Sequence, residues 1–358
     1  MTPTQQLRAA IEVQPTEESG IAKRKGSAGE TTTRTRLRLV GSSNAIRNLR
    51  RQVRQALNLD EPALILGPTG TGKEVVAHTL HQLGKRGARP FLAENCAYSR
   101  ANPQLAHSRL FGHAKGAFTG AAANMQGAFQ RASTGTLFLD EVAELPSEVQ
   151  AMLLRALQEA RVNPLGSLDE THVQTRVVAA TNEDIAALIA TNRFREDLFY
   201  RLSFLTLHTP ALAERKSDIP IIARSLLFDL RETQPPALTT QDVEALISYE
   251  WPGNVRQLLI VVRRAALIEG ITVAQSVAIE QAWDEKIRKA KTATTQAADL
   301  QRRYRPSTAE EVRQRDEVTN DYVQHVYDQV CNRNKAQAAK LLGIARNTLY
   351  KHISGDLR

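Results

Sequence analysis

A glycine-rich segment between an apolar run and a helical pattern limits the folds open to this chain more than any other feature. The segment GPTGTGKE (67–74) follows the run ALIL (63–66) and opens the helical pattern VVAHTL (75–80). Glycines let successive N–H groups converge on phosphate oxygens, a helix N-terminus adds partial positive charge, and the lysine can reach the β- and γ-phosphates. The sequence therefore predicts a nucleotide held by Gly67, Pro68, Thr69, Gly70, Thr71, Gly72, Lys73 and Glu74.

Glu74 departs from the generic pattern of such a loop. The residue after the lysine is normally Ser or Thr, whose hydroxyl binds Mg²⁺. The alternative interpretation is a glycine-rich turn that binds nothing. The spacing, the lysine and the flanking strand and helix together favour nucleotide binding.

A second apolar run ends in two acids. The segment TLFLDE spans Thr136 to Glu141, and a strand of a parallel sheet that ends in this way places both carboxylates at the carboxyl edge, beside the phosphate loop. We expect Asp140 to hold Mg²⁺, directly or through water, and Glu141 to orient and polarise the attacking water. The alternative is a strand that ends in a solvated turn.

Five short apolar runs alternate with helical patterns between about residues 39 and 210. They predict an α/β domain in which helices cover both faces of a parallel sheet. The runs are 63–66, 90–93, 136–139, 177–180 and 204–207. The expected organisation is a disordered arm (1–38), the α/β core (39–210), a small helical domain (211–290), a polar linker (291–307) and a final helical unit (308–358).

Composition narrows the function classes. Two isolated cysteines, Cys96 and Cys331, make neither a disulfide framework nor a metal site, and they fit a reducing cytoplasm. No stretch approaches the roughly 20 apolar residues of a membrane helix and no signal peptide is evident, so we expect a cytoplasmic protein without a membrane partner. From Lys286 onward fifteen Lys/Arg stand against eight Asp/Glu, so +7 of the net +9 lies there. Such a basic end suggests a polyanion partner; a solvated tail is the alternative.

Several further motifs have the spacing of one family. GAFTGA, LFLDE, ATN, FREDLFYRL and WPGNVRQL occupy 116–121, 137–141, 180–182, 194–202 and 251–258. In sequence and order they resemble the central AAA+ domain of the sigma-54-dependent transcriptional activators of bacteria, over roughly residues 39–270. The resemblance implies an AAA+ P-loop fold: a three-layer parallel sheet core, an all-helical lid and a C-terminal helix-turn-helix domain. It also implies an ATPase that uses ATP and Mg²⁺.

The resemblance assigns roles around the nucleotide. Asn95 matches an asparagine that senses nucleotide and restrains the catalytic glutamate. Thr181 and Asn182 match the first sensor motif, and Arg256 matches the second sensor on the lid. These roles add to those of the phosphate loop and of the two acids.

The resemblance implies that two arginines and one loop contact other molecules. Arg195 and Arg201 match arginines that reach the ATP of the neighbouring subunit, which implies a homo-oligomer, from dimer to hexameric ring. Without the resemblance, a surface helix with ion pairs would be the favoured interpretation. An exposed Phe118 at the loop tip suits a partner surface, and a buried turn is the alternative. The loop implied to contact the sigma-54 RNA polymerase holoenzyme is Gly116, Ala117, Phe118, Thr119, Gly120 and Ala121.

Four positions depart from the family pattern. An acid is usual at the positions of Arg109 and Ala114, an arginine at Ala213 and a glutamate at Gln257. None of these positions supplies phosphate, magnesium or water chemistry, so the departures bear on coupling rather than on hydrolysis.

The segment NKAQAAKLLGIARNTLYKHI (334–353) predicts a helix-turn-helix, similar to the Fis-like unit of the same activators. Gly343 suits the left-handed turn residue and Ile344 its anchor. The expected packing residues of the first helix are Ala336, Ala339, Leu341 and Leu342. The residues expected to face double-stranded DNA, at an enhancer-like upstream site, are Arg346, Asn347, Thr348, Tyr350 and Lys351.

An apolar stripe precedes this unit and has two interpretations. It is either a dimer seam or the intramolecular packing face of the unit. Its members are Val312, Val318, Tyr322, Val323, Val326, Tyr327 and Val330.

The sequence therefore predicts a DNA-bound activator that hydrolyses ATP in a ring and remodels closed sigma-54 polymerase complexes. One rival is a DNA-binding regulator whose ATPase only switches assembly. Another is a chaperone-like remodeller with an incidental helical tail. No sensor domain is recognised before residue 39, so a trans-acting regulatory protein, the expression level and the short arm all stay open as means of control.

Overall fold

The computed structural model describes residues 39–230, 237–304, 320 and 322–353. The chain divides between Glu280 and Gln281 into two compact units, and each is described by itself. The predicted arm over 1–38 lies outside the described residues. None of the described helices has both the length and the apolar character needed to cross a bilayer.

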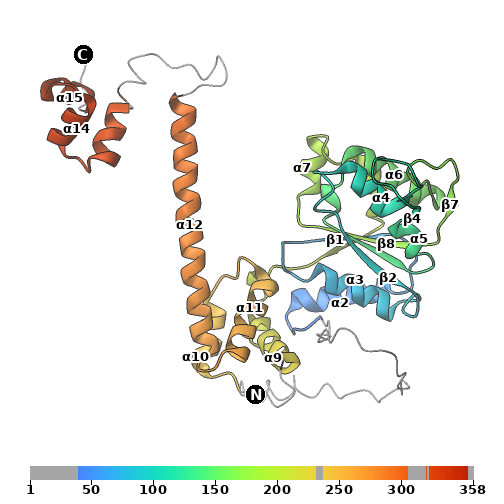
Figure 1. Ribbon diagram of the computed structural model, residues 1–358. Helices are drawn as coiled ribbons and strands as arrows, with labels where there is room; N and C mark the ends of the chain where they lie inside the picture. The colour runs from blue at the N-terminus through green and yellow to red at the C-terminus, as the bar shows by residue number, and fades with distance from the viewer. Residues whose placement is uncertain (1–38, 231–236, 305–319, 321, 354–358) are drawn as a thin grey trace. The chain divides into compact units, whose positions relative to one another are not determined.

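Five parallel strands form the central sheet of the first unit, in the order β2-β5-β8-β1-β9 (Figure 1). Every predicted apolar run becomes one of them, with ends that shift by two residues at most. In β1, Ala63 pairs with Val178 on one side and with Leu205 on the other. The strands are β1 (Ala63–Leu66), β2 (Phe91–Asn95), β5 (Thr136–Asp140), β8 (Arg176–Thr181) and β9 (Leu205–His208).

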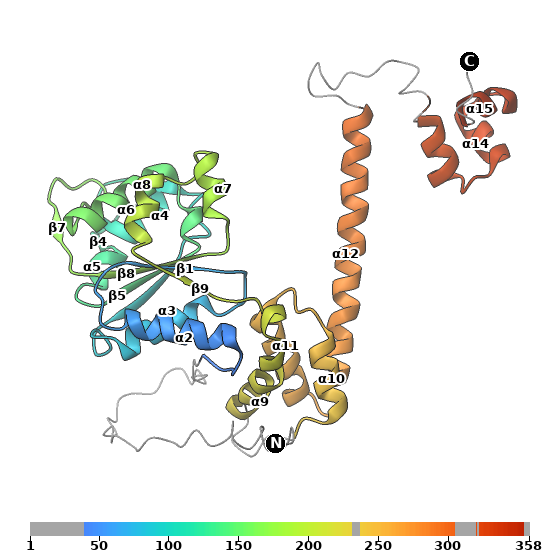
Figure 2. The same cartoon turned by 180° about the vertical axis from the view of Figure 1, so that it is seen from behind.

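The strand side chains alternate between two apolar clusters, one on each face of the sheet. In β1, Ala63 and Ile65 pack with α2 and α3, whereas Leu64 packs with α4 to α8. Figures 1 and 2 show these helical layers on opposite sides of the sheet, which confirms the predicted three-layer α/β core. The helices are α2 (Asn44–Ala56), α3 (Lys73–Leu83), α4 (Pro103–Phe111), α5 (Ala128–Arg131), α6 (Ser147–Glu159), α7 (Ile185–Ala190) and α8 (Glu196–Leu202), with the 3-10 turn η1 (Val142–Glu144) after β5.

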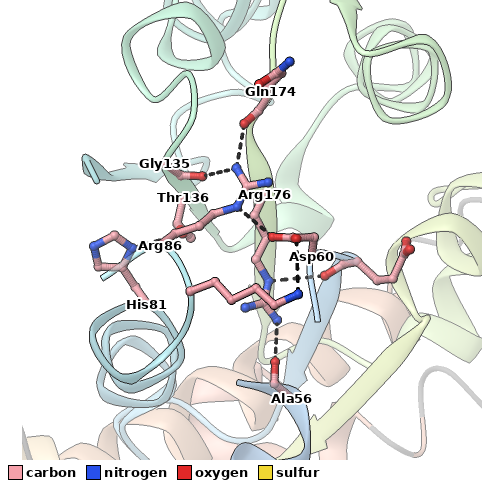
Figure 3. A network of polar contacts seen from close by, with 10 residues as sticks. Ala56, Asp60, His81, Arg86, Gly135, Thr136, Gln174 and Arg176 are labelled. Carbon is pink, nitrogen blue, oxygen red and sulfur yellow. Dashed lines mark hydrogen bonds and ion pairs between the residues drawn. The ribbon is translucent and has the colours of Figure 1, made fainter. Parts of the chain in front are cut away.

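A polar network fixes the amino-terminal edge of the sheet (Figure 3). Arg176, which begins β8 and is buried, donates to the carbonyl oxygen of Ala56 at 3.1 Å. Arg86 binds Asp60 at 2.9 Å and donates to the carbonyl oxygen of Gly135 at 2.9 Å. These bonds tie the loop between α2 and β1 to the starts of β5 and β8. The edge that carries the predicted carboxylates is the opposite one.

Two short antiparallel hairpins stand outside the main sheet and flank the GAFTGA segment. In one, β3 (Gly112–His113) pairs with β4 (Met125–Gln126). In the other, β6 (Arg161–Val162) pairs with β7 (Thr171–His172). The amide of Ala114 donates to the carbonyl oxygen of Leu165 at 2.9 Å, so the loop of the second hairpin supports the start of the GAFTGA segment.

An all-helical lid follows β9, as predicted. Its core surrounds Trp251, which is 1% exposed and donates its ring N–H to the carbonyl oxygen of Leu246 at 2.8 Å. The lid contains η2 (Leu212–Asp218), α9 (Ile219–Leu230), α10 (Thr240–Ser248), α11 (Asn254–Leu267) and the start of α12 (Val273–Tyr304).

Helix α12 extends through most of the segment that we interpreted as a polar linker. Residues 291–304 are helical, whereas polar composition had suggested only a connection. Ala, Gln, Lys and Arg are strong helix formers, so this composition allows a polar helix as readily as a coil. Whether the segment acts as a linker stays a prediction.

The second unit ends in the predicted helix-turn-helix. Helices α14 (Lys335–Leu342) and α15 (Arg346–Ile353) are joined through Gly343 at φ +65°, which confirms the left-handed turn residue. Two predicted packing residues were wrong: Ala336 is exposed and Leu341 is 61% exposed. Ala338, fully buried beside Ala339, takes their place because the helical period puts this pair on the core face.

The apolar stripe before this unit contributes to the same core. Val323, Val326 and Tyr327 are buried there, the latter two in the π-helical turn η4 (Val326–Val330), whereas Tyr322 and Val330 are exposed. Intramolecular packing thus accounts for the middle of the stripe. Val312 and Val318 lie outside the described residues, and the dimer seam stays a prediction.

Candidate nucleotide-binding and ATPase site

A cavity of about 300 Å³ opens at the carboxyl edge of the sheet, between the core and the lid. The phosphate loop lines it from Thr69 to Val75, and Asp140 and Glu141 line it from the end of β5. The lid adds Arg256. The structure therefore brings together most of the predicted nucleotide site, from segments nearly 190 residues apart in the sequence.

The glycines of the phosphate loop are required by both backbone angle and space. Gly70 has φ +78°, and a Cβ there would lie 2.3 Å from the carbonyl oxygen of Gly253. Gly67 has φ +153°, and a Cβ there would lie 2.1 Å from the side-chain oxygen of Thr209. The loop is thus packed against β9 and the lid so closely that no side chain fits at either position.

Lys73 begins α3 and points back into the loop. Its ammonium group donates to the carbonyl oxygen of Gly67 at 3.0 Å, and the residue is only 7% exposed. Burial lowers the pKa of Lys73, while Glu141 and Asp140 act in the opposite direction. A bound polyphosphate would favour the charged ammonium further, because an adjacent opposite charge stabilises that form.

Glu141 occupies a conformation that is uncommon for a side chain of its kind. Its φ of +54° lies in the left-handed region, and its amide donates to Asp140 Oδ1 at 3.1 Å. Burial raises the pKa of Glu141, with Lys73 and a backbone hydrogen bond from Asn182 opposing the rise. A carboxylate with a raised pKa is a better base for a water molecule than an ordinary one.

The residues present fit magnesium that arrives with a nucleotide. Asp140 and Glu74 both line the cavity and offer carboxylate oxygens, which are the hard ligands that Mg²⁺ prefers. No group of three or more His, Cys, Asp or Glu suited to a metal ion occurs among the described residues. Mg²⁺ commonly uses one or two carboxylates together with substrate phosphates, so this donor set is sufficient for MgATP.

The predicted sensor residues lie next to the phosphate loop or to the carboxylates. Asn182 donates its side-chain N–H to Thr69 Oγ1 at 2.7 Å. Thr181 is fully buried, and its carbonyl oxygen accepts from the amide of Gly67 at 3.4 Å. The amide of Arg256 donates to the carbonyl oxygen of Gly70 at 3.2 Å.

Asn95 stands at the end of β2, in register with Asp140 on β5. Its side-chain oxygen accepts from the amide of Ala97 at 2.8 Å, and the residue is exposed. The position is next to the carboxylates predicted to act in catalysis, and the sensing role of Asn95 stays a prediction.

Two residues of the site were missed by the sequence analysis. Asn254 is 5% exposed and joins both domains: it donates to the carbonyl oxygen of Thr69 at 3.0 Å and accepts from the amide of Leu212 at 2.7 Å. Arg215 is buried on the cavity wall and donates to the carbonyl oxygen of Thr71 at 3.2 Å. The position of Asn254 inside WPGNVRQL was the available signal, since asparagine tolerates the left-handed φ of +52° found there.

Asp218, also missed, anchors the chain that leads into the site. It is fully buried and accepts from the amides of Ser42 at 2.6 Å and Ser43 at 2.8 Å, and from the Ser43 hydroxyl at 2.6 Å. The segment just before these serines, 39–40, lines the cavity with apolar side chains. No local pattern indicates this pairing, because the partners are about 175 residues apart.

Family profiles match three consecutive parts of the chain. The "Sigma-54 interaction domain" matches residues 39–208, the "AAA+ ATPase lid domain" residues 213–305, and "Bacterial regulatory protein, Fis family" residues 329–354. The chain belongs to the sigma-54-dependent transcriptional activators. Its core is thus an AAA+ ATPase domain of that family, and its last unit is of the Fis type.

Individual relatives agree with this assignment. The transcriptional regulatory protein GlrR of Escherichia coli (strain K12) is 43% identical over 262 residues, which are 72% of this chain and 58% of GlrR. The response regulator protein PilR of Pseudomonas aeruginosa is 46% identical over 231 residues, 64% of this chain and 52% of PilR. The chain therefore spans only about half the length of the curated relatives that it matches. A crystal structure of NtrX from Brucella abortus in complex with ADP aligns with a TM-score of 0.60 at 26% identity, covering 89% of this chain and 69% of NtrX.

In this chain the GAFTGA loop is folded back on itself, with the amide of Gly116 donating to the carbonyl oxygen of Ala121 at 2.9 Å. The Phe118 ring lies edge-on against the His113 ring, with centroids 5.0 Å apart, and Phe118 is only half-exposed. The sequence predicted an exposed Phe118 and left a buried turn as the alternative; in this conformation the ring is partly buried against His113, and its role as a contact stays a prediction. Thr119 is exposed, and Gly116 and Gly120 have φ of +81° and +105° with open space around them.

The two arginines expected to act on a neighbour lie away from the cavity of their own chain. Arg195 pairs with Asp197 at 2.7 Å, and Arg201 donates to the carbonyl oxygen of Leu157 at 2.8 Å. Both are exposed, and neither lines the nucleotide cavity. Their action across a subunit boundary stays a prediction.

The structure describes only some of the residues that were predicted to face DNA. Asn347 and Thr348 are exposed on α15, whereas Leu349, the next residue, is fully buried. Arg346, Tyr350 and Lys351 belong to the same helix, but their side chains lie outside the described residues. Contact with DNA stays a prediction for all five.

Proposed function

We propose that this protein binds DNA, hydrolyses ATP in a ring of identical subunits and remodels the closed complex of sigma-54 RNA polymerase into an open one. The observation that carries the proposal is the single cavity that joins the phosphate loop, Asp140, Glu141 and Arg256 in a chain that also has an intact GAFTGA loop. Chromosomal DNA and RNA polymerase, as partners, would place the activity in the bacterial cytoplasm.

The chemistry follows from where the side chains lie. The loop amides and Lys73 would bind the β- and γ-phosphates, and the oxygens of Asp140 and Glu74 would hold Mg²⁺. Glu141 would accept a proton from the attacking water, a role that its raised pKa supports. Arg256 would stabilise charge on the phosphates from the lid side.

Among the described residues, the arginines that line the cavity of their own subunit are Arg215 and Arg256, and neither Arg195 nor Arg201 lines it. Arg195, just before α8, and Arg201, on α8, are both exposed, so in a ring they would add positive charge to the site of a neighbouring subunit, where the transferred phosphoryl group needs it. Hydrolysis would then depend on assembly and rise cooperatively with protein concentration.

A complementation assay tests this dependence. Lys73→Ala and Arg201→Ala should each be inactive alone, whereas their mixture should recover roughly a quarter of the wild-type ATPase rate if subunits mix at random in a ring. Arg193→Ala, an exposed arginine of the same segment, serves as the control. No recovery on mixing would mean that Arg201 acts within its own subunit or only in folding.

Coupling to polymerase is tested separately with Thr119→Ala. This variant should hydrolyse ATP at the wild-type rate and fail to form open complexes with sigma-54 polymerase in vitro. Open complexes with a different sigma factor only, or assembly on DNA without any open complex, would favour the regulator whose ATPase switches assembly.

DNA binding is tested with the full chain on double-stranded DNA. Asn347→Ala should lower the affinity for a selected site by about 1–3 kcal/mol, while weaker non-specific binding and its salt dependence should change little. Equal binding to all sequences by the wild type would contradict the proposal and favour the chaperone-like remodeller.

A further inference from the structure

A buried acid is paired at the edge of the sheet next to the catalytic carboxylates. Glu94 of β2 is 4% exposed, and its Oε1 lies 2.7 Å from Arg109 Nε of α4. The hydroxyl of Tyr98 donates to the same oxygen at 3.0 Å. The guanidinium of Arg109 also lies over the Tyr98 ring, 4.7 Å from its centroid. Arg109 thus contacts both the Glu94 carboxylate and the Tyr98 ring.

On one side this cluster joins the catalytic edge. Glu94 precedes Asn95, which is in register with Asp140, and the amide of Cys96 donates to the carbonyl oxygen of Asp140 at 2.8 Å. A shift of Asp140 or Glu141 on nucleotide binding would therefore move the end of β2. Glu94 would move with it.

On the other side the cluster joins the GAFTGA loop. Arg109 lies in the last turn of α4, three residues before Gly112, where β3 and the loop begin. The other anchors of α4 are the apolar side chains of Ala106, Leu110 and Phe111 in the core and the buried hydroxyl of Ser108, which lies 2.7 Å from His113 Nδ1. Apolar contacts lack direction, whereas a charged pair that stacks on a ring has a fixed geometry. Among the described residues, Arg109–Glu94 is the only ion pair between α4 and β2.

We propose that Arg109 is a positioning residue that couples the nucleotide-bound edge of β2 to the GAFTGA loop, with Glu94 and Tyr98 as its partners. Arg109 does not line the nucleotide cavity, so it acts through α4 and not on the reaction itself. The inference rests on the proposed function, because it takes the GAFTGA loop as the part that acts on sigma-54 polymerase. It also gives a structural role to Arg109 itself, which stands where the family pattern usually has an acid.

The first test measures the loop without polymerase. Hydrogen exchange of full-length protein is compared with and without a non-hydrolysable ATP analogue, over 112–126 and over 67–75. In the wild type both segments should respond to the analogue. In Arg109→Ala the phosphate loop should stay protected, while the response of 112–126 should fall at least about fivefold, within the usual range of coupling between sites. An unchanged response, or a wild-type loop that ignores nucleotide, would overturn the inference.

Matched variants separate coupling from folding. Arg131→Ala removes another exposed arginine, on α5, and should behave as the wild type. Arg109→Lys should restore part of the response, because an ammonium reaches Glu94 but does not reproduce the planar contact with Tyr98. If Arg109→Ala does not fold, Arg109→Lys and Tyr98→Phe provide the same test, since each removes only part of the contact. Full responses in both would contradict the pairing.

The second test measures the output. Open complexes formed per ATP hydrolysed should fall at least about tenfold in Arg109→Ala at an ATPase rate within about twofold of wild type, the signature of lost coupling rather than lost chemistry. Equal losses in both quantities would reject a positioning role. If the wild type hydrolyses ATP but opens no sigma-54 promoter, the proposed function fails, while the exchange experiment still decides the coupling by Arg109.

Discussion

Replacing Asn254 should separate the stability of the lid from the binding of nucleotide. Its side chain satisfies the amide of Leu212, which is fully buried, and it holds a φ of +52°. In Asn254→Ala the unsatisfied amide costs about 1–3 kcal/mol. The left-handed backbone adds about 1 kcal/mol for alanine. The free energy of unfolding of the lid should therefore fall by about 2–4 kcal/mol.

Two further substitutions resolve this sum into its parts. Asn254→Gly loses the same hydrogen bonds as Asn254→Ala but adopts the left-handed backbone without strain. It should therefore be about 1 kcal/mol less destabilising than Asn254→Ala. Asn254→Asp keeps an acceptor for Leu212 but loses the donor to the carbonyl oxygen of Thr69. It should retain most of the stability and lose nucleotide affinity, because a carboxylate then faces the phosphate loop.

Urea unfolding of the full chain, followed by the fluorescence of buried Trp251, measures these differences. Trp283, the only other tryptophan, is 57% exposed and can be replaced by Phe in every variant, so that the signal comes from the lid. Equal losses for Ala and Gly would refute the strain argument. A loss below about 1 kcal/mol for both would refute the assigned hydrogen bonds.

Three other predictions follow from the site and the sheet. Gly70→Ala should abolish ATP binding in a fluorescent-nucleotide titration, because its Cβ would overlap the carbonyl oxygen of Gly253. Burial raises the pKa of Glu141, so kcat/KM should begin to fall, as the pH is lowered, above the range in which an ordinary glutamate is protonated. Glu141→Gln should bind ATP and hydrolyse it at least ~100-fold more slowly than the wild type. Arg176→Met should lower the unfolding free energy of the core by about 3–5 kcal/mol in denaturant titrations, since it removes two charged bonds to carbonyl oxygens at the sheet edge.

The elements that the sequence predicted are those whose signals are local. Five apolar runs gave five strands, and the glycines of 67–72 gave the phosphate loop, because periodicity and backbone freedom act over a few residues. In the last unit the turn at Gly343 was found, but the packing face was misplaced to include Leu341. Small errors in helical phase of this kind arise because alanine and leucine serve on either face.

The contacts that complete the site could not be predicted in this way. Asn254 meets Thr69 across 185 positions, and Asp218 meets Ser43 across 175. The pairing of Arg109 with Glu94 depends on how α4 lies on the sheet, which no pattern within either segment indicates. Helix α12 shows the converse case, in which polar composition was taken as a connection although it equally allows a helix.

The bonds of Asp218 have a mechanical consequence. Leu39 and Val40 form part of the cavity wall, and Asp218 grips the chain two residues later, through Ser42 and Ser43. The carbonyl oxygen of Leu39 also accepts from Arg50 Nε of α2 at 3.0 Å. Tension on the polypeptide ahead of Leu39 would therefore be shared between α2 of the core and Asp218 of the lid, and it would act on the wall of the nucleotide cavity between them.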